Sequence, residues 1–254
     1  EVAVAALGAA GAMTDIFAGL ICRPPRKQYK IDELGPTRYL LHDQMCIRRD
    51  LELKNRKKMK IACSHYLPVD SDTFEVEAPV PCVVYLHGNS GSRMDADDLV
   101  DFYLEHKISV FSLDFSGCGL SEGEYVTLGH REKEDLHMVL DYLADLKCIS
   151  HIGLYGRSMG AATALLVAAD DKYYHRIRGM VLDSCYTSVR QVLQELAKKY
   201  VGKVAPQALQ HAPQHAPAAS ALATEHAHAP AQTPQTPAQT PQTPRRSRWC
   251  PSRP

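Results

Sequence analysis

The amino-acid sequence predicts an α/β domain in residues 37 to about 203, with a mostly parallel sheet and helices on both faces. Two observations support this prediction. Apolar, β-rich runs alternate with amphipathic stretches, which is the pattern of parallel strands joined by crossover helices. Glycine-rich turns also follow three of the apolar runs, and ligands in such sheets bind beyond the carboxyl ends of the strands.

The expected strands are apolar runs and the expected helices have one apolar face. Strands are predicted at 45–53, 57–66, 81–86, 108–115, 152–155 and 180–182, with a turn at 55–56 between the first two. Helices are predicted at 96–105, 131–146, 159–169 and 189–200. The apolar face of the first helix is expected to hold Leu99, Phe102 and Tyr103, and that of the second Leu136, Val139, Leu140 and Leu143.

Two flanking segments differ in composition from this domain. Residues 1–36 are a small-residue leader followed by a Pro/Arg segment, and we expect a poorly ordered leader before a start near Met13. Residues 204–254 are a low-complexity tail that repeats His-Ala-Pro and Gln-Thr-Pro. Proline removes backbone donors and few large apolar side chains remain, so this tail is predicted to be disordered.

Charge and cysteine content exclude several function classes. Lys plus Arg equals Asp plus Glu at 29 each, which does not favour nucleic acid as a partner. The eight cysteines are scattered without a CxxC pair, so we expect reduced thiols and a cytoplasmic location.

The uncharged stretch 2–14 does not fit a signal peptide or a membrane-spanning helix, because it lacks a basic n-region and Asp15 interrupts it. Membrane association near residues 17–22 is the alternative.

The sequence Gly156-Arg157-Ser158-Met159-Gly160 lies between a predicted strand and an Ala-rich predicted helix. This is the context that a G-x-S-x-G nucleophile elbow requires. Glycines at 156 and 160 remove side chains that would collide in so tight a turn. Ser158 is therefore the predicted nucleophile, and the Met159 amide at the helix N-terminus can donate to a developing oxyanion.

Two other glycine-rich loops follow predicted strands. In the loop His87-Gly88-Asn89-Ser90-Gly91-Ser92, Asn89 is best placed to give the second oxyanion amide. We expect His87 to brace this loop, because a general base should come later in the chain. Asp114 begins the loop Asp-Phe-Ser-Gly-Cys-Gly-Leu-Ser, which we expect its side chain to hold.

Together these motifs resemble the α/β-hydrolase superfamily, most closely its serine-aminopeptidase-like and monoacylglycerol-lipase-like branch. The resemblance covers about residues 37–203. It implies acyl-serine chemistry at Ser158 on a small ester, thioester or amide substrate, with no cofactor and no metal. It also implies an oxyanion hole made by the Met159 and Asn89 amides.

The remaining catalytic groups are not evident. In this family an acid and then a histidine follow the serine, after the seventh and eighth strands. No such strand is predicted after Tyr186, so we expect the last two strands to be missing, in a truncated or misassembled gene product or a shortened relative. Asp183 is the fallback acid, or else it anchors its own loop. The general-base histidine is unknown: His175 is expected at the wrong edge of the sheet, and the other candidates lie in the tail repeats, namely His211, His215, His226 and His228.

Two functions from different classes therefore stay open. One is a serine hydrolase acting through Ser158. The other is a noncatalytic α/β-hydrolase-like protein whose pocket binds an acyl ligand or a partner. Metal binding by His226 and His228 is a third, although no carboxylate or thiolate cluster accompanies them.

Overall fold

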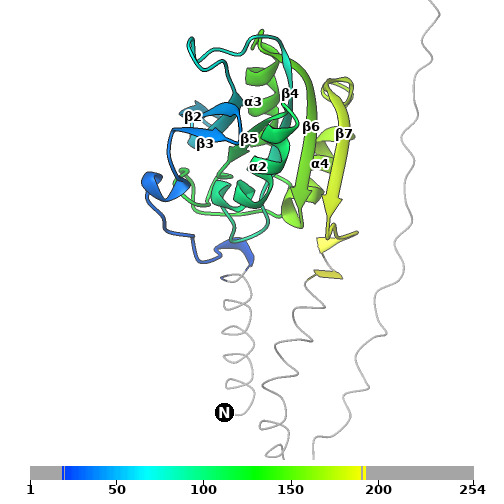
Figure 1. The fold of residues 1–254 in the computed structure, drawn as a ribbon. Helices are drawn as coiled ribbons and strands as arrows, with labels where there is room; N and C mark the ends of the chain where they lie inside the picture. The colour runs from blue at the N-terminus through cyan, green and yellow to red at the C-terminus, as the bar shows by residue number, and fades with distance from the viewer. Residues whose placement is uncertain (1–18, 20, 190, 193–254) are drawn as a thin grey trace, which may run out of the picture. The chain divides into compact units, whose positions relative to one another are not determined.

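A seven-stranded sheet organises the computed structural model, which describes residues 19, 21–189 and 191–192 (Figure 1). The strand order is β1-β2-β3-β5-β4-β6-β7. The strands are β1 (Arg38–Leu41), β2 (Gln44–Lys54), β3 (Lys60–Pro68), β4 (Val80–Leu86), β5 (Ser109–Leu113), β6 (Ile149–Arg157) and β7 (Ile177–Asp183). The helices are α2 (Asp97–Glu105), α3 (Glu132–Ala144) and α4 (Met159–Ala168), with short 3-10 helices η1 (Ile31–Leu34), η2 (Arg93–Ala96) and η3 (Tyr174–Arg176).

The strand directions confirm a mostly parallel sheet. β1, β2 and β3 form an antiparallel meander, and β3 is also antiparallel to β5. The strands β5, β4, β6 and β7 are parallel to their neighbours. Two antiparallel pairings separate β2 from β5, so five of the seven described strands run in one direction.

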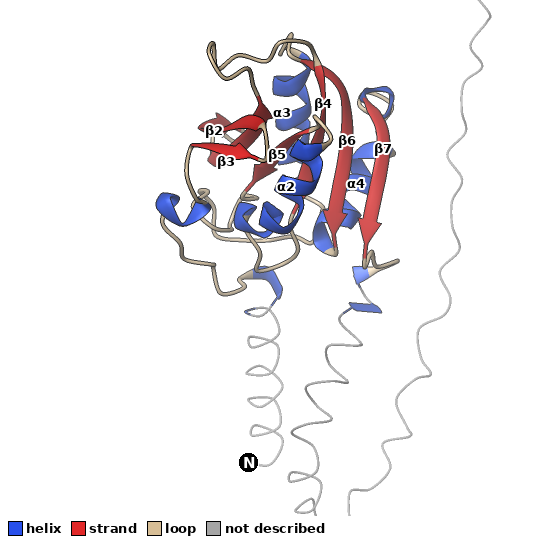
Figure 2. Cartoon of the chain, viewed as in Figure 1, coloured by secondary structure: helices blue, strands red, loops and turns tan. Residues whose placement is uncertain are grey.

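Helices cover both faces of the sheet, as predicted (Figure 2). Alternate residues of a strand point to opposite faces. Val84 and Leu86 of β4 belong to the core that contains α3 and α4 residues, whereas Tyr85 between them packs with α2 residues. The sheet is therefore the middle layer of three, and each face has its own apolar core.

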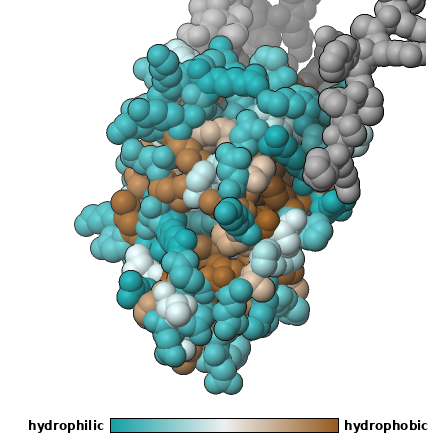
Figure 3. All heavy atoms as spheres, turned by 90° about the horizontal axis from the view of Figure 1, so that it is seen from above, coloured by the Kyte–Doolittle hydropathy of each residue, from teal (hydrophilic) through white to brown (hydrophobic). Residues whose placement is uncertain are grey.

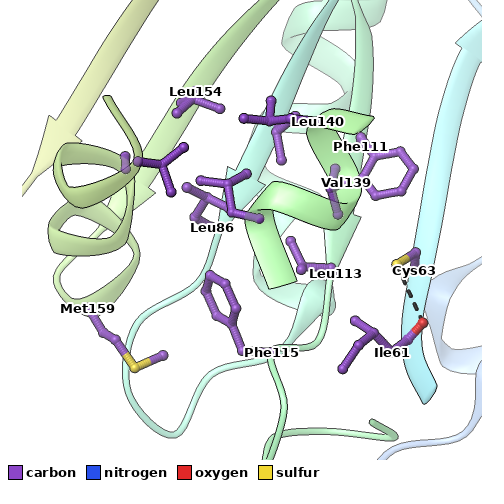
Figure 4. Close-up of a cluster of buried hydrophobic side chains, with 14 of the residues drawn as sticks. Ile61, Cys63, Leu86, Phe111, Leu113, Phe115, Val139, Leu140, Leu154 and Met159 are labelled. Atoms are coloured by element: carbon purple, nitrogen blue, oxygen red, sulfur yellow. Dashed lines mark hydrogen bonds between the residues drawn. The ribbon is translucent and has the colours of Figure 1, made fainter. Parts of the chain in front are cut away.

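The larger core lies between the sheet and the helices α3 and α4. Figure 4 shows Leu86, Leu113 and Leu154 of the sheet together with Val139 and Leu140 of α3. The predicted apolar face of this helix is confirmed, because its four members are fully or almost fully buried: Leu136, Val139, Leu140 and Leu143.

Three details differ from the sequence-based expectations. Phe102 is 57% exposed, because the buried face of α2 is centred on Val100 and Leu104 instead. The strand predicted to start at residue 57 starts at Lys60, because the Asn55 side chain accepts the amides of residues 57 and 59 and extends the turn. The short strand β1 was not predicted, since it has only four residues and its apolar side chains do not alternate with polar ones.

The described cysteines are free thiols, as expected. Four of them are buried: Cys46, Cys63, Cys82 and Cys118. Burial raises the pKa of Cys82 to about 12 and, with nearby carboxylates, that of Cys118 to about 12 as well. These two thiols therefore act as small apolar side chains rather than as nucleophiles.

The chain divides into two units, Glu1–Ala205 and Pro206–Pro254. The second unit lies wholly outside the described residues, as do residues 1–18 and most of the predicted helix at 189–200. The predicted disordered tail and the predicted poorly ordered leader before Met13 therefore stay predictions.

Shortening a core leucine tests the packing of α3 on the sheet. Leu140→Ala is expected to lower the free energy of unfolding by about 2–5 kcal/mol, because Leu140 is fully buried and a cavity would remain. Leu165→Ala in α4 is the matched control, since Leu165 is 42% exposed and its loss should change stability by no more than about 0.5 kcal/mol. Urea denaturation of both variants measures the difference, and similar losses would contradict this description of the core.

The pH dependence of stability tests the burial of His65 in β3. Burial lowers the pKa of His65 to about 3, so the folded protein leaves it neutral at pH 5, whereas the unfolded chain protonates it. The unfolded state then binds more protons, and stability falls as the pH drops below the unfolded pKa of about 6.5. Between pH 7 and pH 5, wild type should lose about 2 kcal/mol more stability than His65→Phe. Equal losses would show that His65 is protonated in the folded protein.

Candidate active site

Ser158 occupies a sharp turn between β6 and α4. Its backbone has φ +51° and ψ −107°, outside the main regions that L-residues adopt. The Ser158 amide donates to the Asp183 carbonyl at the end of β7, with an N–O distance of 2.8 Å. Such strained backbone persists only where the surrounding structure enforces it, and it is common at functional sites.

The two glycines of the motif permit this turn, as the sequence predicts. A Cβ atom on Gly156 would lie 2.6 Å from the Ala161 backbone. A Cβ atom on Gly160 would lie 1.9 Å from the Leu86 carbonyl oxygen. No side chain fits at either distance, so α4 can approach β6 and the end of β4 only because these residues are glycines.

The predicted oxyanion donors lie on the two segments that meet at Ser158. Met159 is the first residue of α4, where backbone amides have no partner within the helix. The loop after β4 approaches from the other side, since a Cβ atom on Gly88 would lie 3.7 Å from Ser158 Cβ. Among the described residues, neither the Met159 amide nor the Asn89 amide donates a backbone hydrogen bond. Their role as the oxyanion hole stays a prediction.

His87 braces its loop, as expected. The ring is fully buried, and its Nε2 accepts the Phe115 amide at 3.0 Å. Nδ1 therefore carries the proton and donates to the Gly88 carbonyl at 2.7 Å. Burial lowers the pKa of His87, so the ring stays neutral and both of its nitrogens are engaged.

Asp114 holds its loop, which confirms the structural role expected from the sequence. Its carboxylate is fully buried and accepts the backbone amides of Arg93 at 2.7 Å and Leu120 at 2.8 Å. The Tyr29 hydroxyl also donates to it, at 2.5 Å. A Cβ atom on Gly119 would collide with this carboxylate, so the loop wraps closely around it.

Asp183 lies beside the elbow but contacts Ser158 through its backbone. Its carboxylate lies 3.6 Å from the Arg157 guanidinium and accepts the Ser184 hydroxyl at 2.7 Å. These contacts suit the loop-anchoring role that the sequence left open. Among the described residues no histidine bonds to this carboxylate, and its role as the fallback acid stays a prediction.

The described residues do not supply a base in contact with Ser158. The Ser158 hydroxyl makes no hydrogen bond within residues 21–189. His175 lies in η3, immediately before the amino end of β7, which confirms its position at the wrong edge of the sheet. The tail histidines fall outside the described residues: His211, His215, His226 and His228.

Neither a metal cluster nor a membrane span is found in the part of the chain that the structure describes. No three His, Cys, Asp or Glu side chains there are placed to hold a metal ion. No helix there has the length and apolar character needed to cross a membrane.

The Pro/Arg segment, expected to lie outside the core, packs on the loops of the candidate site from residue 21 onward. Ile21 and Tyr29 are buried, at 6% and 7% exposure. This segment forms hydrogen bonds with residues of three loops. The Ile21 carbonyl accepts the Asn89 side-chain amide at 3.4 Å, and the Cys22 carbonyl accepts the Val126 amide at 2.9 Å. Arg26 donates to the Ser121 carbonyl at 2.8 Å. We call residues 21–29 the N-terminal strap. Composition alone did not reveal these contacts, because their partners lie far away in the chain: Arg26 and Ser121, for example, are 95 residues apart.

A small pocket lies at the opposite end of the parallel strands. Its volume is about 150 Å³, and it is lined by residues that include Val69, Val80 and Lys107. Val80 begins β4, whereas Ser158 follows the last residue of β6. Figure 3 shows the molecule from above relative to Figure 1, that is, from the end at which β6 and β7 begin. Apolar residues lie between hydrophilic ones on this face. This pocket is therefore separate from the candidate active site.

Adding one methyl group tests the close approach at Gly160. Gly160→Ala is expected to lower the free energy of unfolding by about 3 kcal/mol, because α4 must move away from the Leu86 carbonyl. Gly179→Ala in β7 is the matched control, since a Cβ atom there meets nothing within 4 Å. Chemical denaturation measures both, and a Gly160→Ala protein as stable as the control would mean that the turn does not need this glycine.

Comparison with known proteins identifies the family of the chain. The family model of the serine aminopeptidases, S33, matches residues 77–244, more than half of the chain. An uncharacterized membrane protein of Saccharomyces cerevisiae, YNL320W, is 28% identical over 140 residues, which are 54% of this chain and 48% of that protein. The uncharacterized protein YfhR of Salmonella typhi is 27% identical over 130 residues, 47% of this chain and 44% of that protein. The chain thus spans about half the length of the curated relatives it matches.

Solved structures share the fold. The esterase Pf2001 of Pyrococcus furiosus superposes with a TM-score of 0.56 at 23% sequence identity, over 75% of this chain and 65% of that one. Identity at this level establishes the fold alone. Together with the family match, it shows that the chain belongs to the serine aminopeptidase S33 family of the α/β-hydrolase superfamily.

Proposed function

We propose that the protein is a serine hydrolase that cleaves small esters through an acyl-enzyme at Ser158. One observation carries the proposal: Ser158 is held in a strained turn at the N-terminus of α4, beside two amides without a backbone partner among the described residues. Acyl transfer requires a hydroxyl and two amide donors that act on one carbonyl group, and we assign these roles to Ser158, Met159 and Asn89. A solved structure of the same fold is described as an esterase, which supports esters as the substrate class.

The chemistry follows from these positions. The Ser158 oxygen forms a bond to the carbonyl carbon of the ester, and its proton passes to a general base. The carbonyl oxygen becomes an oxyanion, which the Met159 and Asn89 amides stabilise. The alcohol leaves with the proton, and water then hydrolyses the acyl-serine ester. Thioesters and amides can follow the same steps.

The proposal requires a base outside residues 21–189, because the Ser158 hydroxyl has no partner within them. Asp183 is our candidate to orient that base, since it ends β7 beside the elbow. The same observation favours the second candidate function, a noncatalytic protein that binds an acyl ligand at this hydroxyl and these amides.

A fluorophosphonate probe separates the two candidates. Wild type is expected to react covalently with the probe and to hydrolyse p-nitrophenyl acetate, because both reactions need an activated serine. Ser158→Ala should abolish labelling and lower kcat/KM by about a thousandfold or more. Intact-protein mass spectrometry measures the labelling, and Ser71→Ala, at an exposed turn, is the control that should react like wild type.

Each other outcome has a distinct meaning. Labelling that persists in Ser158→Ala would place the nucleophile elsewhere and overturn the proposal. A folded wild-type protein that neither reacts nor hydrolyses esters would support the noncatalytic alternative.

A further inference from the structure

The oxyanion loop, residues 87–92, is held at both of its ends by the dipeptide that follows β5. At its start, His87 accepts the Phe115 amide at 3.0 Å. Just after its end, the Arg93 amide donates to the Asp114 carboxylate at 2.7 Å. The position of the Asn89 amide therefore depends on how firmly Asp114 and Arg93 are themselves fixed.

Tyr29 of the N-terminal strap joins these two residues. Its hydroxyl donates to Asp114 Oδ2 at 2.5 Å and accepts from Arg93 Nε at 2.7 Å. The direct distance between Arg93 Nε and Asp114 Oδ2 is 4.0 Å, too long for a hydrogen bond. The hydroxyl thus bridges two buried, oppositely charged groups that do not bond through these atoms.

The bridge is protected from water and from titration. Tyr29, Arg93 and Asp114 are 7%, 2% and 0% exposed. Burial and the bond to Asp114 both raise the pKa of Tyr29, so its hydroxyl keeps the proton that it donates. Without the hydroxyl, Arg93 Nε would be buried without its partner, and the guanidinium would be drawn toward Asp114. Because Arg93 directly follows the oxyanion loop, that movement would displace the loop.

A second contact joins the strap to the same loop. The Asn89 side-chain amide donates to the Ile21 carbonyl at 3.4 Å, and the Asn89 side-chain oxygen accepts the Ser90 amide at 3.1 Å. The strap therefore meets the oxyanion loop at Asn89 and, through Tyr29, at its far end.

We propose that Tyr29 is a positioning residue that sets the oxyanion loop, and that the N-terminal strap is thereby a working part of the active site. The catalytic half of this inference rests on the proposed function. Its structural half, the ordering of residues 87–92 by the Tyr29 hydroxyl, does not.

Tyr29→Phe in the full chain tests the inference, because it removes the bridging oxygen and keeps the ring. Tyr174→Phe is the matched control, since Tyr174 is 58% exposed. Amide hydrogen–deuterium exchange, followed by mass spectrometry of peptides, is expected to show at least about threefold faster exchange in residues 87–93 of Tyr29→Phe only. Peptides from α3 should exchange as in wild type, because global opening would speed every region together.

The rate measurements address catalysis. In Tyr29→Phe, kcat for p-nitrophenyl acetate should fall about tenfold to a hundredfold with KM nearly unchanged, as expected when a donor is displaced by a fraction of an ångström. The inhibition constant of a trifluoromethyl ketone, whose adduct places an oxyanion in the hole, should rise by a similar factor.

Unchanged exchange in residues 87–93 would overturn the inference, and so would equal exchange increases in those residues and in α3. Faster exchange with an unchanged kcat would overturn its catalytic half. A wild-type protein without activity would count against the proposed function alone, because the exchange result stands without it.

Discussion

The contact between Gly160 and the end of β4 determines most of the candidate site. With no side chain at Gly160, the first turn of α4 lies so close to the Leu86 carbonyl that a Cβ atom would be only 1.9 Å from its oxygen. Leu86 is the last residue of β4, and the oxyanion loop starts at the next residue. One close approach therefore brings together the nucleophile, the helix N-terminus and the loop with the second predicted donor. The strained backbone of Ser158 is the local consequence of this approach.

A buried polar network then fixes what the glycine contact brings together. The Asp114 carboxylate accepts two backbone amides and the Tyr29 hydroxyl while fully buried. A carboxylate is costly to bury unless such bonds compensate it, so a loop that rearranged would lose that compensation. The network therefore favours a single arrangement of the loops around Ser158. This is the rigidity that a preorganised oxyanion hole requires.

Local sequence was sufficient for the parts of the fold that local chemistry specifies. The elbow could be predicted because glycine, serine and glycine at fixed spacing, between a strand and a helix, have few other uses. The core face of α3 could be predicted because Leu136, Val139, Leu140 and Leu143 repeat with the helical period. The structural role of His87 could be predicted because the general base of this family comes later in the chain, and that of Asp114 because it begins a glycine-rich loop.

The strap could not be predicted, because its binding depends on partners far away in the chain. Tyr29 and Asp114 are 85 residues apart, and the carbonyls of Ile21 and Cys22 carry no sequence signature. The predicted apolar face of α2 was wrong in part, at Phe102, for a related reason. Leu99 and Tyr103 of the predicted stripe do pack against the core, but Phe102 is exposed, and the buried face is centred on Val100 and Leu104. Residue propensities and hydrophobic periodicity predict that a helix or strand forms, whereas tertiary contacts decide which side of it is buried.

The strain at Ser158 bears on the choice between an enzyme and a noncatalytic binding protein. A non-glycine residue at such a backbone geometry costs about 1–3 kcal/mol, a large share of the net stability of a domain. A pocket that only binds an acyl group gains nothing from holding a hydroxyl in that geometry, since an unstrained turn could present the same two amides. Acyl transfer does gain, because the attacking oxygen must lie close to the carbonyl carbon while the donors face the carbonyl oxygen. The conformational free energy that the Ser158 backbone costs is therefore more readily explained by catalysis than by binding alone.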